Sequence, residues 1–157
     1  MDLDQMPTSL FTTIQYSPSA QQDVTSLIHR LRFFLPPKTS TFAVFEQRGT
    51  SGQDIGRQPH VHIVVMGVDE TLYRRLIRRL FGALSGDIVT QRLNSWRTAD
   101  VVTRYLQGRK KDIAKGEVET SERWRKMIDV PQFIDVNGAR KRAARGVTPD
   151  ELAGIAG

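Results

Sequence analysis

Hydrophobic and polar residues follow clear periods along the first part of the chain. The stretch 9–16 is β-branched and aromatic and predicts a strand, and residues 20–35 then carry apolar side chains at helical spacing up to Pro36. Strand-like patterns over 39–47 and 60–66 predict two neighbouring antiparallel strands, because the polar segment between them carries glycines suited to a long hairpin loop.

A second helix is predicted from Asp69, a good N-cap residue, to about Leu84. A short strand over 87–93 and a helix over 98–108 follow. We expect the apolar stripe of the second helix to comprise Leu72, Leu76, Leu80 and Leu84, and a separate solvated face to carry Arg74, Arg75, Arg78 and Arg79. The order β-α-β-β-α-β-α predicts an α+β fold of the split βαβ or ferredoxin-like type. Its helices lie mainly on one face of an antiparallel sheet, so the other face can carry a site.

The pattern changes again near the C-terminal end. From Gly138 onward aromatic residues vanish and small and basic residues dominate, so we place a packed domain over residues 1–137. Residues 148–151 form a capping box with few residues after it. Residues 138–157 are therefore expected to be a flexible basic linker or the start of a truncated downstream domain.

The composition limits the chemistry that a site in this chain can use and the kinds of partner that it can bind. The 157 residues include 23 Lys and Arg against 17 Asp and Glu, a net charge of +6, which favours a polyanionic partner such as nucleic acid or an anionic membrane surface. With no cysteine, disulfides, thiol nucleophiles and Cys-ligated zinc are excluded. No apolar stretch or leader pattern suggests a membrane span or a signal peptide, so we expect a soluble intracellular protein without a membrane partner.

Two histidines on one strand are the first sign of a metal site. His60 and His62 are two residues apart, so alternation places both imidazoles on one face of the sheet. Glu46, near the end of the preceding strand, is the expected third ligand, and Asp54 in the loop is the reserve candidate. Two imidazoles and one carboxylate leave open positions on Mn²⁺ or Mg²⁺. The competing interpretation is a His-x-His pair that only decorates the surface or satisfies a sheet edge.

A tyrosine supplies the candidate nucleophile. Tyr105 lies on the predicted helix over 98–108 and is followed closely by Arg109, Lys110 and Lys111. A phenol has a pKa near 10, so its attack on an electrophile needs positive charge or a metal nearby, which this basic run could supply in part. The competing interpretation is a buried aromatic residue followed by a solvated charge cluster.

Taken in order, these segments resemble a known family. Phe45-Glu46, the loop, the run Pro59 to Val65 and then Tyr105 resemble the HUH endonucleases, the Rep nuclease domains of rolling-circle and rolling-hairpin replicons. These replicons include circular single-stranded DNA viruses, parvoviruses and small plasmids. The family's strand motif, His-hydrophobic-His motif and tyrosine motif correspond to 10–15, 60–62 and Tyr105 onward, and the resemblance covers about residues 9–111.

The resemblance implies a function and a set of residues. Glu46, His60 and His62 would hold Mn²⁺ or Mg²⁺, and Tyr105 would nick single-stranded DNA in an origin hairpin through a 5′-phosphotyrosine intermediate that also allows strand joining. The lysine that circular viral Reps usually place three residues after the tyrosine is Gly108 here. Arg109, Lys110 and Lys111 are the candidates for its charge role, with Arg109 and Lys110 assigned to catalysis. The expected DNA contacts are Arg48, Arg57, Arg104 and Lys111.

The same resemblance extends to partners and location. An ATPase or helicase domain that also mediates oligomerisation would follow in the intact protein. A viral protein of a eukaryotic host would work in the nucleus, and otherwise in the cytoplasm.

Two further functions stay open. A single-tyrosine transposase or a relaxase of the same superfamily would differ in its substrate. A non-catalytic module resembling an RRM would use the ferredoxin-like sheet to bind bases and make the histidines incidental, although HVHIVVM lacks the aromatic strand signature of that class. We expect Tyr16 and Tyr73 to be packing residues, and Trp96 and Trp124 to lie in the core or at its rim.

Overall fold

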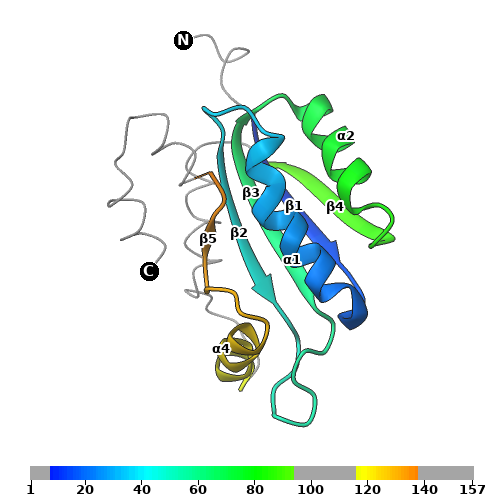
Figure 1. The fold of residues 1–157 in the computed structure, drawn as a ribbon, viewed down its shortest axis with the longest axis vertical. Coiled ribbons are helices and arrows are strands. Elements are labelled where there is room, and N and C mark those ends of the chain that lie inside the picture. Colours follow the sequence, from blue (N-terminus) through cyan, green and yellow to red (C-terminus); the bar gives the residue numbers. More distant parts are fainter. Residues whose placement is uncertain (1–7, 94–115, 138–157) are drawn as a thin grey trace.

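The computed structural model describes residues 8–93 and 116–137, which contain five strands and three α-helices (Figure 1). In chain order these are β1 (Thr8–Gln15), α1 (Gln21–Arg30), β2 (Ser40–Glu46), β3 (His60–Val68), α2 (Glu70–Phe81), β4 (Asp87–Leu93), α4 (Glu117–Met127) and β5 (Ile134–Asp135). The predicted α+β class is confirmed. The predicted helices and strands lying within the described residues are present, most with ends shifted by a few residues.

The strands form one antiparallel sheet in the order β4-β1-β3-β2-β5. The first four positions have the order and antiparallel pairing of a ferredoxin-like sheet, with which the structure is compatible. β1 and β3 occupy the centre, so the strand that carries the histidines has a hydrogen-bonded neighbour on each side.

α1 and α2 cover one face of the sheet (Figure 1). Val24 and Ile28 of α1 are fully buried against it, together with Leu31 of the 3₁₀ turn that follows. The predicted single helix over 20–35 is therefore shorter, because the chain tightens into 3₁₀ turns at Pro18–Ala20 and Leu31–Phe33 on either side of it.

The predicted apolar stripe of α2 is wrong at its first member. Leu72 is 64% exposed, and the fully buried face consists of Tyr73, Ile77 and Phe81. Leu76, Leu80 and Leu84 pack only partly against the core, so the buried stripe is rotated by one residue from the leucine repeat. The Asp69 cap is confirmed, since its side chain accepts the backbone N–H of Leu72 at 2.9 Å.

α4 and β5 were not predicted. α4 lies beside the end of β2 and near the hairpin loop, and β5 adds a short fifth strand to the edge of β2 (Figure 1). Trp124 of α4 and Ile134 of β5 join the same core as the two earlier helices. None of the described helices has the length and apolar character that a membrane span requires.

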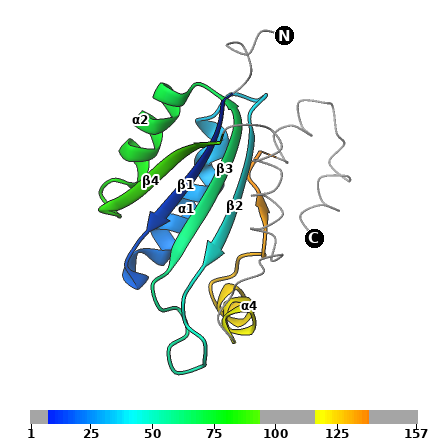
Figure 2. The same cartoon turned by 180° about the vertical axis from the view of Figure 1, so that it is seen from behind.

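The opposite sheet face carries no described helix across β4, β1 and β3 (Figure 2). A smaller apolar cluster lies there, centred on Val44 and Val64 with Phe11 and Met66 against it. Side-chain alternation puts Glu46 of β2 and His60 and His62 of β3 on this face as well, so the three candidate ligands share one face of the sheet.

Candidate metal centre

Strand register brings the three predicted metal ligands together. Glu46 lies directly opposite His60 in the β2–β3 pair, and Val44 lies opposite His62. His60 and His62 are on one face because they are two residues apart, and Glu46 is on that face because it is paired with His60. The carboxylate therefore lies beside both rings.

The ligand atoms lie at distances that a single ion can bridge. Glu46 Oε2 is 3.4 Å from His62 Nε2 and 3.6 Å from His60 Nε2, and all three ligand atoms lie within 4.8 Å of one another. Ligands about 2.1 Å from one ion lie roughly 3.0–3.4 Å apart when they are neighbours. The cluster could therefore hold a metal ion after small side-chain adjustments. Glu46 and His60 are buried and His62 is half-buried.

His60 is oriented as a metal-binding imidazole. Its Nδ1 lies 2.9 Å from the backbone carbonyl oxygen of Gln58, which can only accept, so Nδ1 carries the proton and donates it. Nε2 is then an unprotonated acceptor, and it is buried with no hydrogen-bond partner. A buried lone pair without a partner costs free energy unless a cation or a donor satisfies it. A metal ion shared with Glu46 fits this atom.

His62 is oriented from the other neighbouring strand. Thr13 of β1 is its register partner, and Thr13 Oγ1 lies 3.0 Å from His62 Nδ1. A ring that donates from Nδ1 to this hydroxyl keeps the Nε2 lone pair toward Glu46, the arrangement commonly found around metal-binding histidines. Phe11 stacks on the same imidazole with ring centres 5.2 Å apart. The ring is therefore fixed by both a hydrogen bond and packing.

Arg125 of α4 supports the end of β2 from within the core. The side chain is buried, and its Nε donates to the carbonyl oxygen of Phe45, the residue before Glu46, at 2.9 Å. Burial lowers the pKa of Arg125, while the carboxylates of Glu46 and Glu122 act in the opposite direction and favour its charge. α4 thus supplies a buried positive charge to the strand end that carries the carboxylate ligand.

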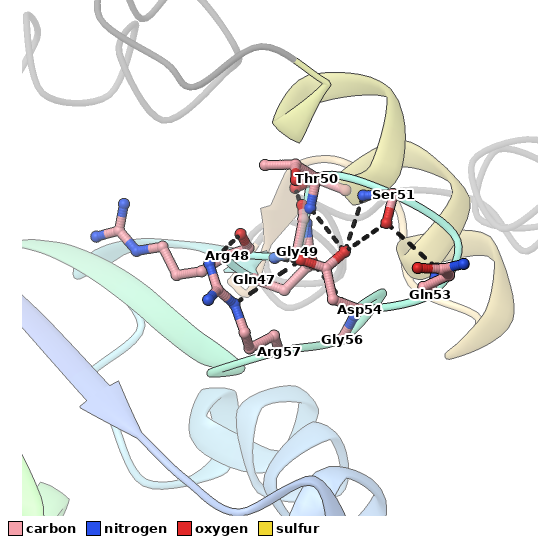
Figure 3. A network of polar contacts seen from close by, with 10 residues as sticks. Gln47, Arg48, Gly49, Thr50, Ser51, Gln53, Asp54, Gly56 and Arg57 are labelled. Carbon is pink, nitrogen blue, oxygen red and sulfur yellow. Dashed lines mark hydrogen bonds and ion pairs between the residues drawn. The ribbon is translucent and has the colours of Figure 1, made fainter.

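A polar network fixes the hairpin loop between β2 and β3 (Figure 3). The fully buried Gln47 accepts the backbone N–H groups of Gly49 and Gly56 with Oε1, and its Nε2 donates to the carbonyl of Gly49 and to Ser121 Oγ of α4. A Cβ at Gly49 would lie 2.2 Å from the backbone oxygen of Asp54, so only glycine fits. The loop that separates Glu46 from His60 is consequently ordered and attached to α4.

Asp54, the reserve ligand, is not part of the cluster. Its Oδ1 accepts the backbone N–H groups of Thr50 and Ser51 and the Ser51 hydroxyl, at 2.9–3.0 Å (Figure 3). These hydrogen bonds, from Ser51 above all, lower the pKa of Asp54, with Arg57 adding a smaller effect. The carboxylate closes the loop turn, which is why it does not reach the histidines.

The two loop arginines expected to contact DNA lie on different sides of the hairpin. Arg48 lines a small pocket of about 50 Å³ together with Thr13, Gln58 and both histidines, so its charge borders the candidate metal centre. Its Nη1 lies 3.8 Å from Glu117 Oε1. Arg57 instead borders a larger pocket beside α4.

The predicted nucleophile and the residues around it, Arg104, Tyr105, Arg109, Lys110 and Lys111, lie outside the described residues. Tyr16 and Tyr73 are packing residues, as expected, being 7% and 1% exposed. Burial raises the pKa of each phenol well above its ordinary value. Trp124 belongs to the core, and Trp96 lies outside the described residues.

Three residues that orient the site were not predicted: Thr13, Gln58 and Arg125. Thr13 and Arg125 act only through tertiary pairing, and Gln58 acts through its backbone carbonyl, which carries no sequence signal. The alternation of β1 placed Thr13 on the open face, but its pairing with His62 depends on register.

No protein-family model matches the chain, and comparison with curated proteins and with solved structures likewise finds no match.

Proposed function

We propose that this protein is a metal-dependent endonuclease of the HUH type, which nicks and rejoins single-stranded DNA at a replication origin. The observation that carries the proposal is the cluster of Glu46, His60 and His62, in which the buried Nε2 of His60 has no hydrogen-bond partner. A site of this kind fits catalysis better than structural support, because three ligands leave positions open for a substrate. It lies on the sheet face that no described helix covers across β4, β1 and β3 (Figure 2), which supports access by a DNA strand.

The two imidazoles and the carboxylate fit Mn²⁺ or Mg²⁺, with the nitrogen ligands favouring Mn²⁺. When bound, the ion would polarise the scissile phosphate and stabilise the charge that develops on it. The residues of the chain hold and orient this site: Gln58 and Thr13 fix the two rings, and Arg125 supports the strand end that bears Glu46. Arg48 at its border offers a positive charge to the phosphates.

Tyr105 is the proposed nucleophile. Its phenolic oxygen would attack phosphorus in line with the leaving 3′ oxygen, forming a phosphotyrosine ester as the P–O3′ bond breaks. The phenol loses one proton and the 3′ oxygen gains one, so the step is balanced and leaves a free 3′-OH that can prime synthesis. Attack by another 3′-OH on the ester reverses the step and joins strands. Tyr16 and Tyr73 are unsuited to this role because both phenols are buried.

Basic residues supply the remaining contacts. Arg109 and Lys110 are proposed to favour the phenolate of Tyr105, with Arg104, Lys111, Arg48 and Arg57 neutralising backbone phosphates. Such contacts make affinity dependent on salt concentration. The proposed substrate is the single-stranded loop of an origin hairpin. A downstream ATPase or helicase domain would unwind the parental duplex, and a protein of a eukaryotic virus would act in the host nucleus.

A covalent-adduct assay tests the proposal. Purified protein is incubated with Mn²⁺ and a library of single-stranded hairpin loops labelled at the 3′ end, and the denatured products are separated by gel electrophoresis. We expect a labelled protein band with wild type and none with Tyr105→Phe or His62→Ala, whereas Tyr73→Phe keeps it. An adduct that persists in Tyr105→Phe would overturn the nucleophile assignment. DNA binding without any adduct would favour the non-catalytic, RRM-like module.

A further inference from the structure

A second pocket lies on the far side of the hairpin loop from the candidate metal centre. It has a volume of about 490 Å³ and is bounded by the loop, by the start of α1 and by α4. Pockets of roughly 300–1,000 Å³ typically enclose a small molecule or a single group of a larger one. It is too small for a helix or a duplex.

We propose that this pocket binds one unpaired nucleobase with an exocyclic amino group, which means cytosine, adenine or guanine but not thymine, of the DNA strand that crosses the metal centre. The inference rests on the proposed function, because it takes single-stranded DNA as the substrate. It adds a position at which the protein selects a base.

Apolar side chains from three separate elements form the walls. Pro18 comes from the turn before α1, Ile55 and Pro59 come from the loop, and Trp124 and Met127 come from α4. A planar heterocycle gains most from this kind of lining, since each base presents an apolar face and polar edges. Met127 lines the pocket and is 69% exposed, so its side chain is accessible to a base bound there.

The close fit of the loop against Trp124 gives the pocket a defined shape. Gly56 has a left-handed φ of +84°, and a Cβ built there would lie 3.3 Å from the indole Nε1 of Trp124. Together with the hydrogen bond from Gln47 Nε2 to Ser121 Oγ, this packing holds the loop and α4 at a fixed separation. The pocket is therefore preformed, which lowers the entropic cost of binding.

Two charged groups border the apolar walls. Asp54 Oδ1 accepts the hydrogen bonds of the loop turn. Among the described residues, the polar contact of Oδ2 is the ion pair with Arg57 Nε, 4.0 Å away. A carboxylate oxygen accepts from the exocyclic amino group of cytosine or adenine, which thymine lacks. The exposed guanidinium of Arg57 suits the phosphate of the same nucleotide. The pocket thus offers an acceptor for the amino group of a base, a cation for its phosphate and apolar walls for the faces of its ring.

The pocket and the metal centre are both bordered by residues of the hairpin between β2 and β3. Arg48 N–H donates to the carbonyl of Arg57 at 2.7 Å, and Arg57 Nη2 donates back to the carbonyl of Arg48 at 3.1 Å. Arg48 borders the histidines and Arg57 borders the pocket, so a strand that follows the hairpin from one to the other would meet a positive charge at each. Pro59 of the pocket directly precedes His60 in the chain.

Fluorescence anisotropy in EDTA tests binding apart from chemistry. The probes are fluorescein-labelled oligo-dC and oligo-dT of about 12 nucleotides, and an abasic strand of equal length that keeps every phosphate. Met127→Glu places a carboxylate at the pocket. The matched control is Leu72→Glu on α2, which makes the same charge change at a residue of similar exposure, 64% against 69%. Thermal unfolding checks that both variants fold.

We expect wild type to bind oligo-dC about tenfold more tightly than the abasic strand, as one bound base would give. Met127→Glu should lose that difference, and Leu72→Glu should keep it. Asp54→Asn retains an acceptor for the loop turn but exchanges the second oxygen for a donor, so the preference for oligo-dC over oligo-dT should disappear or reverse.

The contrary results separate the two proposals. If Met127→Glu and Leu72→Glu bind oligo-dC equally well while wild type discriminates against the abasic strand, the bases are bound elsewhere and the pocket inference fails. Equal binding of oligo-dC and oligo-dT by wild type would overturn the assignment to an amino-bearing base. If wild type binds none of the strands, the proposed function itself fails. The metal centre is tested independently by the adduct assay.

Discussion

Arg125 Nε donates a hydrogen bond to the carbonyl oxygen of Phe45, 2.9 Å away, from a position almost fully inside the core. This contact ties α4 to the end of β2, one residue before Glu46. It links a helix distant in the sequence to the geometry of the candidate metal centre.

Removal of the Arg125 guanidinium should weaken both the fold and the metal centre. We expect Arg125→Met to lower the free energy of unfolding by about 2–3 kcal/mol, since it leaves a buried carbonyl without its donor, as measured by urea denaturation. A merely structural role would leave the Mn²⁺ affinity of the folded protein unchanged. We expect that affinity, measured by isothermal titration calorimetry, to fall about tenfold. Arg125→Lys should recover part of both losses.

Mn²⁺ should stabilise the wild-type protein against heat through the Glu46, His60 and His62 cluster. At an ion concentration 100 times the Kd the gain is about 2.7 kcal/mol. Glu46→Gln should abolish most of that gain, because it removes the carboxylate shared by the two imidazoles. Glu119→Gln, the same change at an exposed position of α4, is the matched control and should respond to Mn²⁺ like wild type. Equal stabilisation of both variants would place the ion elsewhere.

The buried hydroxyl of Tyr73 makes stability depend on alkaline pH. Burial raises the pKa of Tyr73 in the folded protein, and its hydrogen bond with Thr12 Oγ1, at 2.8 Å, opposes this only in part. The unfolded phenol has a pKa near 10, so above that pH the unfolded state loses a proton that the folded state keeps. The contribution of Tyr73 to the free energy of unfolding is therefore fully present below about pH 10 and decreases as the pH rises above that value.

Tyr73→Phe removes this titration. We expect the free energy of unfolding of the variant to fall less steeply above pH 10, by up to about 1.4 kcal/mol per pH unit relative to wild type. Urea unfolding at a series of pH values between 8 and about 11 measures the slopes. Parallel slopes for the two proteins would show that the Tyr73 phenol ionises as readily in the folded state.

Two glycines of the chain should respond very differently to alanine. A Cβ at Gly49 would lie 2.2 Å from the backbone oxygen of Asp54, whereas a Cβ at Gly86 meets nothing within 4 Å. We expect Gly49→Ala to destabilise by about 2 kcal/mol, since backbone must move to make room, and Gly86→Ala to be neutral or slightly stabilising. Differential scanning calorimetry distinguishes them. If Gly49→Ala is as stable as wild type, the loop network around Gln47 tolerates the added methyl and the expectation is wrong.

Local pattern was sufficient to predict strands β1 to β4 and the first two helices. The alternation of 60–66 and the Asp69 cap are short-range signals, because they depend on backbone geometry within a few residues. The burial of α2 was mispredicted at Leu72 because two apolar stripes run side by side on that helix. Only contact with the sheet decides that the stripe of Tyr73, Ile77 and Phe81 is the buried one. α4 was missed because its sequence is mostly polar, with Trp124 as its one large apolar side chain in the core.

By itself the sequence determined the residue types of the candidate metal centre and the face that they share. A cysteine-free chain with His60 and His62 two apart on a strand restricts any ligand set to imidazoles and oxygen donors. Tertiary structure decided the rest: the register that pairs Glu46 with His60, the carbonyl and hydroxyl that orient the two rings, the exclusion of Asp54 and the support from Arg125. These depend on contacts between residues far apart in the chain, and strand register and helix docking are set by the packing of the whole core rather than by local periodicity.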